Sequence, residues 1–462
     1  MTGRGTTSYT IRLWFFAILC AGSFFIINPG ALFAAGESGA DPAVSFKGYL
    51  STRYVYRWTE VANEKITDQD VFGELRIDMT TPKTNTYEFH FFGTARDDLS
   101  GNHNTTTFYP YEDIGDTYQS NSHGYLYEAH LDVNNMLPYV TQVRLGRQAG
   151  TRDEPVFFDG LAADIGGSKL NLTLYGGEAV HFYEVNYKWG DDTLGGVGLD
   201  YAPWRSTKLS LDYLSVNDLH QFPSDRDQKD QLYAFKIWQR LGDSTKATAK
   251  LRYVNGDPRD VSVRALSAFP NAGTELNVNY QRQFRTQNEL STELSSFFDV
   301  LGQSFPYQSY DVKVRQLFGE HYAFDLGYFK RTLLDASQEN FFNHDYSRSF
   351  VLLELIDLPA RGVSLTLTGE RWETQNREYN SAGFDLGYAF NKPRNASINV
   401  GTYYSLYKYD YYIELGNRDN VRTYYLNGRF PLGKSLSING SYEYEKSLEN
   451  YQTLKLGMRY DF

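Results

Sequence analysis

Apolar and polar residues alternate along most of this chain. The last eleven residues, Gln452-Thr-Leu-Lys-Leu-Gly-Met-Arg-Tyr-Asp-Phe462, show the pattern most plainly. Successive side chains of a β-strand point to opposite faces, so Leu456 and Met458 share one face while Lys455 and Arg459 share the other. Similar stretches of about ten residues, separated by turns rich in Gly, Pro and Asn, predict β-strands throughout the chain.

The alternating stretches predict 22 strands. They span residues 44–58, 70–81, 87–99, 124–134, 140–148, 156–166, 169–180, 194–203, 207–217, 231–241, 245–254, 261–269, 273–285, 307–318, 321–333, 347–358, 362–373, 380–391, 396–409, 420–431, 436–447 and 451–462. Short turns and longer polar connections alternate from both ends, so an even number of strands puts both termini on one side. The alternation blurs in 156–166 and 261–269, which leaves totals of 18 or 20 strands open.

The period of two also separates charged from apolar side chains. In the second stretch Leu75, Ile77 and Met79 share one face, and Glu74 and Arg76 lie on the other. A charged side chain that faces lipid at the midplane costs about 2–4 kcal/mol, so this separation is typical of a membrane-spanning sheet. We therefore predict an all-β fold, a transmembrane antiparallel up-and-down β-barrel of about 22 strands (18–22) without a plug domain. A soluble β-sandwich or solenoid would leave the apolar face unexplained.

The N-terminus is typical of a secretory signal peptide. Arg4 and Arg12 precede an apolar stretch, residues 13–27, that is too short to span a membrane as a helix. Small residues follow, and we place cleavage near Ala34 or Ala35, so that residues 1–35 form the signal peptide and 36–462 a single barrel domain. A lipoprotein anchor on Cys20 is the alternative, but bulky Leu19 precedes Cys20 and the apolar core continues after it in residues 24–27. Cleavage would lower the formal charge from −11 to −13 and remove the only thiol.

Composition narrows the function classes further. No later segment approaches 18 consecutive apolar residues, which argues against a helical membrane protein. The 38 Tyr and 31 Phe suit strands whose aromatic rings lie at both membrane interfaces. An acidic surface does not bind phosphate backbones, so nucleic acid is not expected as a partner.

With these features the chain resembles bacterial outer-membrane β-barrels, whose last strand commonly ends in Phe. The resemblance implies that Tyr460 and Phe462 belong to an assembly signal read by the barrel-assembly machinery. It also implies the outer membrane of a Gram-negative cell, periplasmic termini, and contact with outer-membrane lipid and lipopolysaccharide.

A barrel of 18 to 22 strands is too wide to be closed by its own wall side chains. TonB-dependent transporters fill such a barrel with an N-terminal plug, but here only eight residues separate the predicted cleavage site from the first strand. We therefore expect a porin, a channel for passive diffusion of small hydrophilic solutes or ions, with mixed charge and without strong selectivity. Candidate pore-lining residues are Arg53, Arg57, Arg76, Arg96, Arg144, Asp164, Lys250, Arg252, Lys313, Arg315, Arg422, Arg429, Lys455 and Arg459.

One short motif suggests a constriction. The segments Leu145-Gly-Arg-Gln148 and Phe157-Phe-Asp-Gly160 resemble a pair of strands in several porin and alginate-export-like families, and Leu170–Gly177 continues the likeness. The charged candidates for the constriction are Arg147, Arg152, Asp153, Glu154 and Asp159. Both signs of charge near the channel mouth would create a transverse field that orients polar solutes. A purely structural turn with exposed ions is the alternative, and the connection 100–123 is a second candidate for folding inward.

In size and architecture the chain also resembles the barrels that sheath multihaem cytochromes in electron conduits. The sequence holds no Cys-x-x-Cys-His motif, so it would attach no c-type haem itself and would depend on multihaem c-type cytochromes as partners. No cofactor of its own is expected in either case.

The chain holds eight histidines that could serve catalysis or metal binding. No motif links them to a nucleophile, and barrel enzymes are much smaller, so we expect no catalytic residues and no enzyme. Glu88 and His90 on one predicted strand share a face with Glu128, His130 and Asp132 on the next. A zinc or calcium site there is conceivable on residue types alone, but wet channel walls routinely hold such side chains, and polar packing is the preferred interpretation.

Overall fold

The structure is a computed structural model of the chain. It describes residues 44–61, 64–81, 86–100, 122–150, 152–154, 156–180, 190, 192–220, 226–286, 305–338, 343, 345–374, 378–391, 395–405, 421–446 and 450–462. The predicted signal peptide, Cys20 and the connection between residues 101 and 121 lie outside the described residues.

The described chain consists of 22 strands and two short 3₁₀ helices. The strands are β1 (Ser45–Val61), β2 (Glu64–Thr80), β3 (Tyr87–Ser100), β4 (Ser122–Leu137), β5 (Val140–Ala149), β6 (Phe157–Gly166), β7 (Leu170–Ala179), β8 (Thr193–Trp204), β9 (Thr207–His220), β10 (Arg226–Leu241), β11 (Thr245–Val254), β12 (Asp257–Phe269), β13 (Thr274–Gln283), β14 (Tyr307–Phe318), β15 (Tyr322–Leu333), β16 (Tyr346–Ile356), β17 (Val363–Thr374), β18 (Glu378–Ala389), β19 (Ser397–Ser405), β20 (Val421–Pro431), β21 (Leu436–Lys446) and β22 (Asn450–Asp461). The helices are η2 (Pro270–Ala272) and η5 (Ala336–Gln338).

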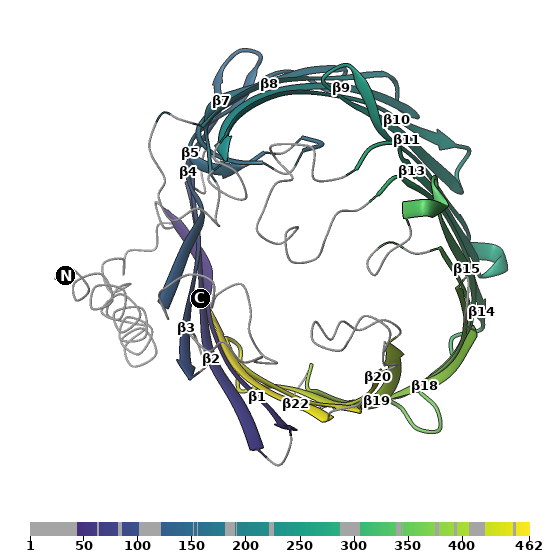
Figure 1. Ribbon diagram of the computed structural model, residues 1–462. Coiled ribbons are helices and arrows are strands. Elements are labelled where there is room, and N and C mark those ends of the chain that lie inside the picture. The colour runs from purple at the N-terminus through teal and green to yellow at the C-terminus, as the bar shows by residue number, and fades with distance from the viewer. Residues whose placement is uncertain are drawn as a thin grey trace. The chain divides into compact units, whose positions relative to one another are not determined.

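The strands form one 22-stranded antiparallel sheet in which neighbours in sequence pair with each other (Figure 1). Strand β1 pairs with β2 on one side and with β22 on the other, so the first and last strands close the sheet. Gly48 and Phe462 exchange two backbone hydrogen bonds of 3.0 Å at this seam, and the Phe462 ring stacks on Phe46 at 5.1 Å. The predicted fold class, an antiparallel up-and-down β-barrel of 22 strands, is confirmed.

The two regions where alternation blurs are strands as well. They are β6 and β12, so the lower totals of 18 or 20 strands are wrong. The predicted bounds of the first two strands, 44–58 and 70–81, are too short, because β1 and β2 stay paired as far as Val61 and Glu64. Polar residues such as Glu60 and Lys65 continue the ladder there as cross-strand partners, and such pairs extend a hairpin without an apolar face.

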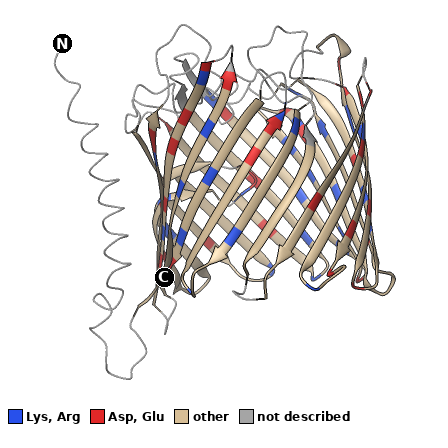
Figure 2. Ribbon diagram, turned by 90° about the horizontal axis from the view of Figure 1, so that it is seen from below, with Lys and Arg blue, Asp and Glu red and all other residues tan. Residues whose placement is uncertain are grey.

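Each strand presents an apolar face and a polar face. Exposed apolar side chains of paired positions share one face, such as Leu326 with Val351 and Leu145 with Leu161. Lys, Arg, Asp and Glu are distributed along the strands between them (Figure 2). A closed sheet with an apolar outer face is the β-structure that spans bacterial outer membranes, and this is the location of the protein. Within the described residues, no helix has the length and apolar character needed to cross a membrane.

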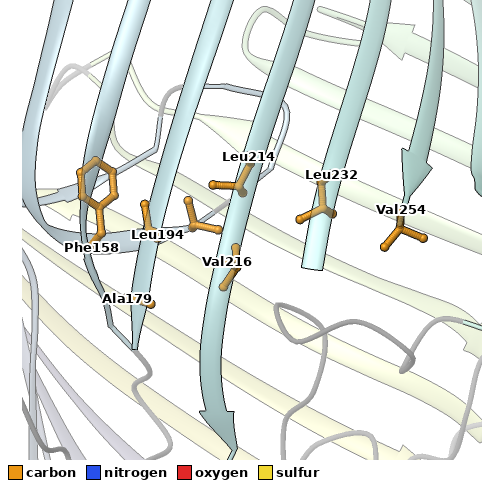
Figure 3. Packing of buried hydrophobic residues seen from close by; sticks show 8 residues of the cluster. Phe158, Ala179, Leu194, Leu214, Val216, Leu232 and Val254 are labelled. Carbon is orange, nitrogen blue, oxygen red and sulfur yellow. The ribbon is translucent and has the colours of Figure 1, made fainter. Parts of the chain in front are cut away.

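The chain divides into two compact units. Unit 1 comprises the described parts of Met1–Asn134, Ala389–Val400 and Ser405–Phe462, and unit 2 comprises those of Asn135–Tyr388 and Gly401–Tyr404. Unit 2 holds a cluster of buried apolar side chains on β6 to β11, seen in Figure 3. Its members are Val156, Phe158, Ala179, Leu194, Leu214, Val216, Leu232 and Val254.

Candidate functional site

The connection between β5 and β6 lies against the polar face of unit 2. We call residues 150–156 the inner segment; its described members are Gly150, Arg152, Asp153, Glu154 and Val156. The backbone N–H of Gly150 donates to the Val156 carbonyl at 2.6 Å, which closes the base of the segment. Three consecutive charged residues, Arg152, Asp153 and Glu154, lie between Gly150 and Val156. Each of them contacts a strand that is distant in the sequence.

Arg152 binds two acids on neighbouring strands. Its Nη1 donates to Asp200 of β8 at 2.9 Å, and its Nε donates to Asp212 of β9. Burial would lower the pKa of the Arg152 guanidinium, but the hydrogen bonds and charges of Asp212 and Asp200 outweigh this and raise the pKa above its ordinary value. Arg152 is therefore a permanent cation and a fixed link between the inner segment and the sheet.

Asp153 and Glu154 bind basic residues on β10 to β12. Asp153 Oδ1 lies 3.7 Å from the Nζ atoms of both Lys236 and Lys250. Glu154 Oε1 accepts from Arg252 at 3.1 Å and from Arg259 at 2.8 Å. The side chains of Arg152, Asp153 and Glu154 are only 11%, 12% and 10% exposed. All three charges of the inner segment are therefore paired against the wall.

Two glycines of β8 leave room for side chains packed on the sheet, and one of these side chains is Arg152. A Cβ atom on Gly198 would overlap the Arg152 guanidinium, and one on Gly196 would overlap the Tyr175 ring. Glycine inside a strand often marks a close approach by another group. Gly198 thus allows Arg152 of the inner segment to lie directly on the sheet.

Apolar contact adds a second anchor. Val156 at the end of the inner segment is 8% exposed and packs in the cluster of Figure 3, where Phe158 and Val216 are 1% exposed. Full burial of such a side chain contributes about 1.5–3 kcal/mol relative to an exposed one. The cluster occupies positions of β8 to β11 that have the same parity as Asp200, Asp212 and Arg252, so it lies on the polar face.

The motif of β5 and β6 has a structural explanation. Arg147 donates to both carboxylate oxygens of its register partner Asp159, at 2.8 and 2.6 Å. Gln148 donates to the carbonyls of Gly146 and Gly160 at 3.3 and 3.1 Å. These contacts join the two strands next to the inner segment, which agrees with the alternative of a structural turn.

The constriction prediction needs a correction for Arg147 and Asp159. Their register neighbours two residues away are Leu145 and Leu161, which are exposed and apolar. Alternation therefore puts the Arg147–Asp159 pair on the apolar face, opposite the buried Gln148. The predicted candidates that the structure brings together are Arg152, Asp153 and Glu154, with Lys250 and Arg252 from the pore-lining set.

Arg422 is also misplaced in the pore-lining prediction. It has the same parity as Tyr424, Leu426 and Phe430, which are exposed on the apolar face of β20. Arg429 is seven positions further along an uninterrupted ladder and therefore lies on the polar face. At the end of its strand, opposite Lys446, Arg422 lies where a charged side chain on the apolar face costs little.

The register places the remaining pore-lining candidates of unit 1 on the polar face. Arg57 forms ion pairs with Asp68 and Asp70, and Arg96 forms one with Asp70 at 2.7 Å. Arg53 lies over the Phe72 ring at 4.6 Å. The other candidates of this unit each contact a neighbour: Arg76 contacts Asp78 at 3.1 Å, Lys455 contacts Glu443 at 3.3 Å, and Arg459 contacts Asp461 at 2.8 Å.

The candidates of unit 2 fall into two groups besides the inner segment. Arg144 and Asp164 line a small pocket on β5 to β7 together with Gln148, Thr173 and Tyr175. Further along the sheet, Lys313 forms an ion pair with Asp325 at 2.7 Å, and Arg315 forms one with Glu354 at 2.6 Å.

Sequence reasoning missed the residues that hold the inner segment. These are Asp200, Asp212, Lys236 and Arg259; Asp260 contacts the segment only indirectly, since it accepts from Arg252 at 3.0 Å. Alternation puts Asp200, Asp212 and Lys236 on a polar face but does not indicate what they touch. The glycine-rich start of β8 was a signal that could have pointed to a close contact.

No protein-family model matches the chain, and no curated protein matches it in sequence. Solved structures do match it in fold. The translocation pore of the P pilus usher PapC matches with a TM-score of 0.50 at 10% identity, over 89% of this chain and 99% of that chain. OccAB4 of Acinetobacter baumannii matches with a TM-score of 0.44 at 10% identity, over 92% of this chain and 100% of that chain. A BenF-like porin from Pseudomonas fluorescens Pf-5 matches with a TM-score of 0.42 at 10% identity, over 90% of this chain and 99% of that chain.

At this identity the likeness to the usher pore shows the fold alone, and the two lower scores add nothing to it. The chain thus has the architecture of bacterial outer-membrane β-barrels, as expected from its alternation and terminal Phe.

Proposed function

We propose that the protein is a porin, a passive outer-membrane channel for small hydrophilic solutes or ions, in which the inner segment forms a constriction. The observation that carries the proposal is the pairing of Arg152, Asp153 and Glu154 with strands β8 to β12. A connection that only joined two strands at a membrane surface would not need three charged residues directed at the polar face. These contacts hold the inner segment against the channel wall, where it narrows the path of solutes without closing it.

The wall beneath the inner segment is divided by charge. Acids Asp200 and Asp212 lie on β8 and β9, whereas the bases Lys236, Lys250 and Arg252 lie on β10 and β11. Charges of opposite sign on these neighbouring strands create a local field beside the path, which orients solutes that carry a dipole. We therefore propose polar or zwitterionic solutes as the substrate class, with weak selectivity between anions and cations.

The pore-lining candidates other than Arg422 lie on the polar face and stay in this proposal as the lining of the channel. Most of them are paired with carboxylates, so the wall is close to neutral over short distances. Such a wall solvates ions of either sign and gives no strong preference to one.

Conductance of the purified protein in planar lipid bilayers tests the proposal. We expect ohmic single-channel steps and a small reversal potential under a salt gradient. A barrel that serves as the sheath of multihaem cytochromes would instead be sealed to ions, or conduct only with its partners, and that result would overturn the porin.

A matched pair of variants links the conductance to the inner segment. Asp200→Asn together with Asp212→Asn frees Arg152, and we expect larger and noisier steps. Asp311→Asn together with Asp325→Asn removes the same charge from β14 and β15, away from the segment, and should leave the step noise unchanged.

We further propose that Phe462 is part of the signal read by the barrel-assembly machinery, together with Tyr460. Its ring stacks on Phe46 and its backbone pairs with Gly48, so Phe462 also lies where the sheet closes. Phe462→Ala should reduce the amount of folded protein in the outer membrane, while the same variant refolded in detergent should still form a heat-modifiable barrel. Equal loss in both settings would assign Phe462 to closure of the sheet alone.

A further inference from the structure

Two histidines and three carboxylates meet on the polar face of β2, β3 and β4 in unit 1. The register aligns Asp78 with His90 and His90 with His130, and the next rung aligns Glu88 with Asp132. All five side chains therefore lie on one face of three adjacent strands. Because the strands fix the backbone, the side chains need no loop to bring them together.

The His90 ring is held in one orientation. Its Nδ1 lies 2.6 Å from Asp78 Oδ1, and Arg76 Nε donates to the other oxygen of Asp78 at 3.1 Å. This contact directs His90 Nε2 toward the acids of the next rung. A histidine that binds a metal almost always gives its second ring N–H to a carboxylate, a backbone carbonyl or a water.

The remaining donor atoms converge on the same space. His90 Nε2 lies 3.5 Å from Glu88 Oε2 and 3.9 Å from Asp132 Oδ2, while His130 Nε2 lies 3.7 Å from Asp132 Oδ1. Atoms of His90, His130 and Asp132 that could bind a metal lie within 4.8 Å of one another. Donors around a tetrahedral ion with bonds near 2.0–2.1 Å are about 3.4 Å apart, so small side-chain rotations would complete the shell.

Two members of this cluster are almost completely buried. The side chains of His130 and Asp132 are 6% and 2% exposed, and the two imidazole rings stack with centroids 4.9 Å apart. Buried charges are usually paired or coordinate a metal, and the negative charge of three carboxylates around two rings favours a cation there. Arg76 supplies one positive charge at the edge of the cluster, on Asp78.

We propose that His90, His130, Asp132 and Glu88 bind a divalent first-row transition-metal ion of the Zn²⁺ class, with Asp78 as the residue that orients His90. Two imidazoles with carboxylates suit this class, whereas Ca²⁺ and Mg²⁺ prefer oxygen ligands alone. The sequence favoured polar packing for these residues; the contact of Asp78 with the far side of His90, which spacing alone does not reveal, is the reason to depart from it.

The site lies near the end of the sheet at which the C-terminal residue, Phe462, is paired. Thr80, where β2 ends, pairs with Ser45 at the start of β1, and Phe462 pairs with Gly48 a few residues away. This part of the inference rests on the proposed channel: a bound ion would add positive charge to the wall at that edge. Zn²⁺ should then lower the permeability of cations relative to anions.

Zn²⁺ titration of purified, refolded protein by calorimetry tests the site without reference to transport. We expect one ion per chain, no such binding in His90→Gln/His130→Gln, and affinity about 10–100-fold weaker in Asp78→Asn. His321→Gln is the matched control and should bind as the native protein does. His321 is exposed in the turn before β15, outside the cluster, and its Nδ1 lies 2.9 Å from the Ile356 carbonyl oxygen.

Absence of stoichiometric binding, or equal binding in the native protein and the double histidine variant, would overturn the site. If the double variant failed to fold, the absorption spectrum of Co²⁺ bound to native protein decides: bands of a tetrahedral ion with nitrogen and oxygen ligands support the site, and the spectrum of hydrated Co²⁺ refutes it. A protein that binds Zn²⁺ but does not conduct would refute the channel and leave the site standing.

Discussion

The polar faces of the two units use ion pairs for different purposes. In unit 1, Arg57 and Arg96 join Asp70 to neighbouring strands, with partners 13 and 26 residues apart in sequence. In unit 2, Arg152 and Glu154 join a connection to the sheet across 48 and 98 residues. The first arrangement strengthens a ladder that backbone hydrogen bonds already hold, whereas the second holds a segment that has few other contacts.

The two kinds of ion pair should therefore respond differently to mutation. Removal of a strand-to-strand ion pair should change stability and leave the path of solutes as it was. Removal of a segment-to-strand pair should change the path and leave the sheet intact. Variants that separate these two outcomes test the comparison.

The largest effect is expected from Arg152→Met/Asp153→Asn/Glu154→Gln. Without its three charged contacts the inner segment loses its hold on β8 to β12, so single-channel conductance should rise about twofold or more as the open cross-section grows. Conductance in planar bilayers measures this.

Its control changes net charge by the same amount on the strands. Asp311→Asn/Lys313→Met/Asp325→Asn removes two acids and one base from β14 and β15 and should leave the conductance near the native value. Equal conductance of the native protein and the inner-segment variant would show that the segment does not narrow the channel.

Arg57→Met tests the other half of the comparison. Asp68 and Asp70 would lose a partner while almost fully buried, at 5% and 1% side-chain exposure, and the cost is about 3 kcal/mol. The urea midpoint of unfolding, followed by heat-modifiable electrophoretic migration, should fall clearly with no change in conductance. Arg53→Met, which removes a contact with the Phe72 ring, should cost only about 0.5–1 kcal/mol.

Gly198→Ala should displace the Arg152 guanidinium, because a Cβ atom there overlaps it. We expect a loss of about 1 kcal/mol and a modest change in conductance, since a flexible side chain can move aside. Gly195→Ala, on the opposite face, meets only the Tyr175 carbonyl oxygen at 3.9 Å and should change stability by less than about 0.5 kcal/mol. Identical conductance in both variants would count against Arg152 as part of the constriction.

The smallest effect concerns the corrected face of Arg147. Arg144→Gln removes a cation from the polar face and should shift the reversal potential slightly toward cation selectivity. Arg147→Gln removes a cation from the apolar face and should not shift it. A shift in Arg147→Gln as large as that in Arg144→Gln would return Arg147 to the channel lining.

Alternation predicted the strands of both units because successive side chains of a pleated strand point to opposite faces. Alternation also implies the corrected faces of Arg147 and Arg422. Arg144 and Arg147 are three residues apart, and Arg422 and Arg429 are seven apart, so neither pair can share a face of a regular strand. A strict count of parity would have found both. The extension of β1 and β2 was missed because charged cross-strand pairs there replace the apolar pattern.

The inner segment shows what alternation cannot supply. Charges in a connection do not indicate which way it folds, and the partners of Glu154 follow it by 98 and 105 residues. The contact of Asp78 with His90 is a different case, since it follows from the register of β2 and β3 once the hairpin is known. The candidate metal site was thus closer to prediction than the constriction.

One face of this sheet meets lipid and the other meets water, and two adjacent residues of β22 distinguish the two faces. Lys455→Cys and Leu456→Cys, each in a Cys20→Ser background, would be reacted with a membrane-impermeant thiol reagent in lipid vesicles. We expect the cysteine at 455 to react rapidly and the one at 456 to stay protected, although Leu456 is 48% exposed in the protein without its membrane. Equal reaction rates at the two positions would contradict the account.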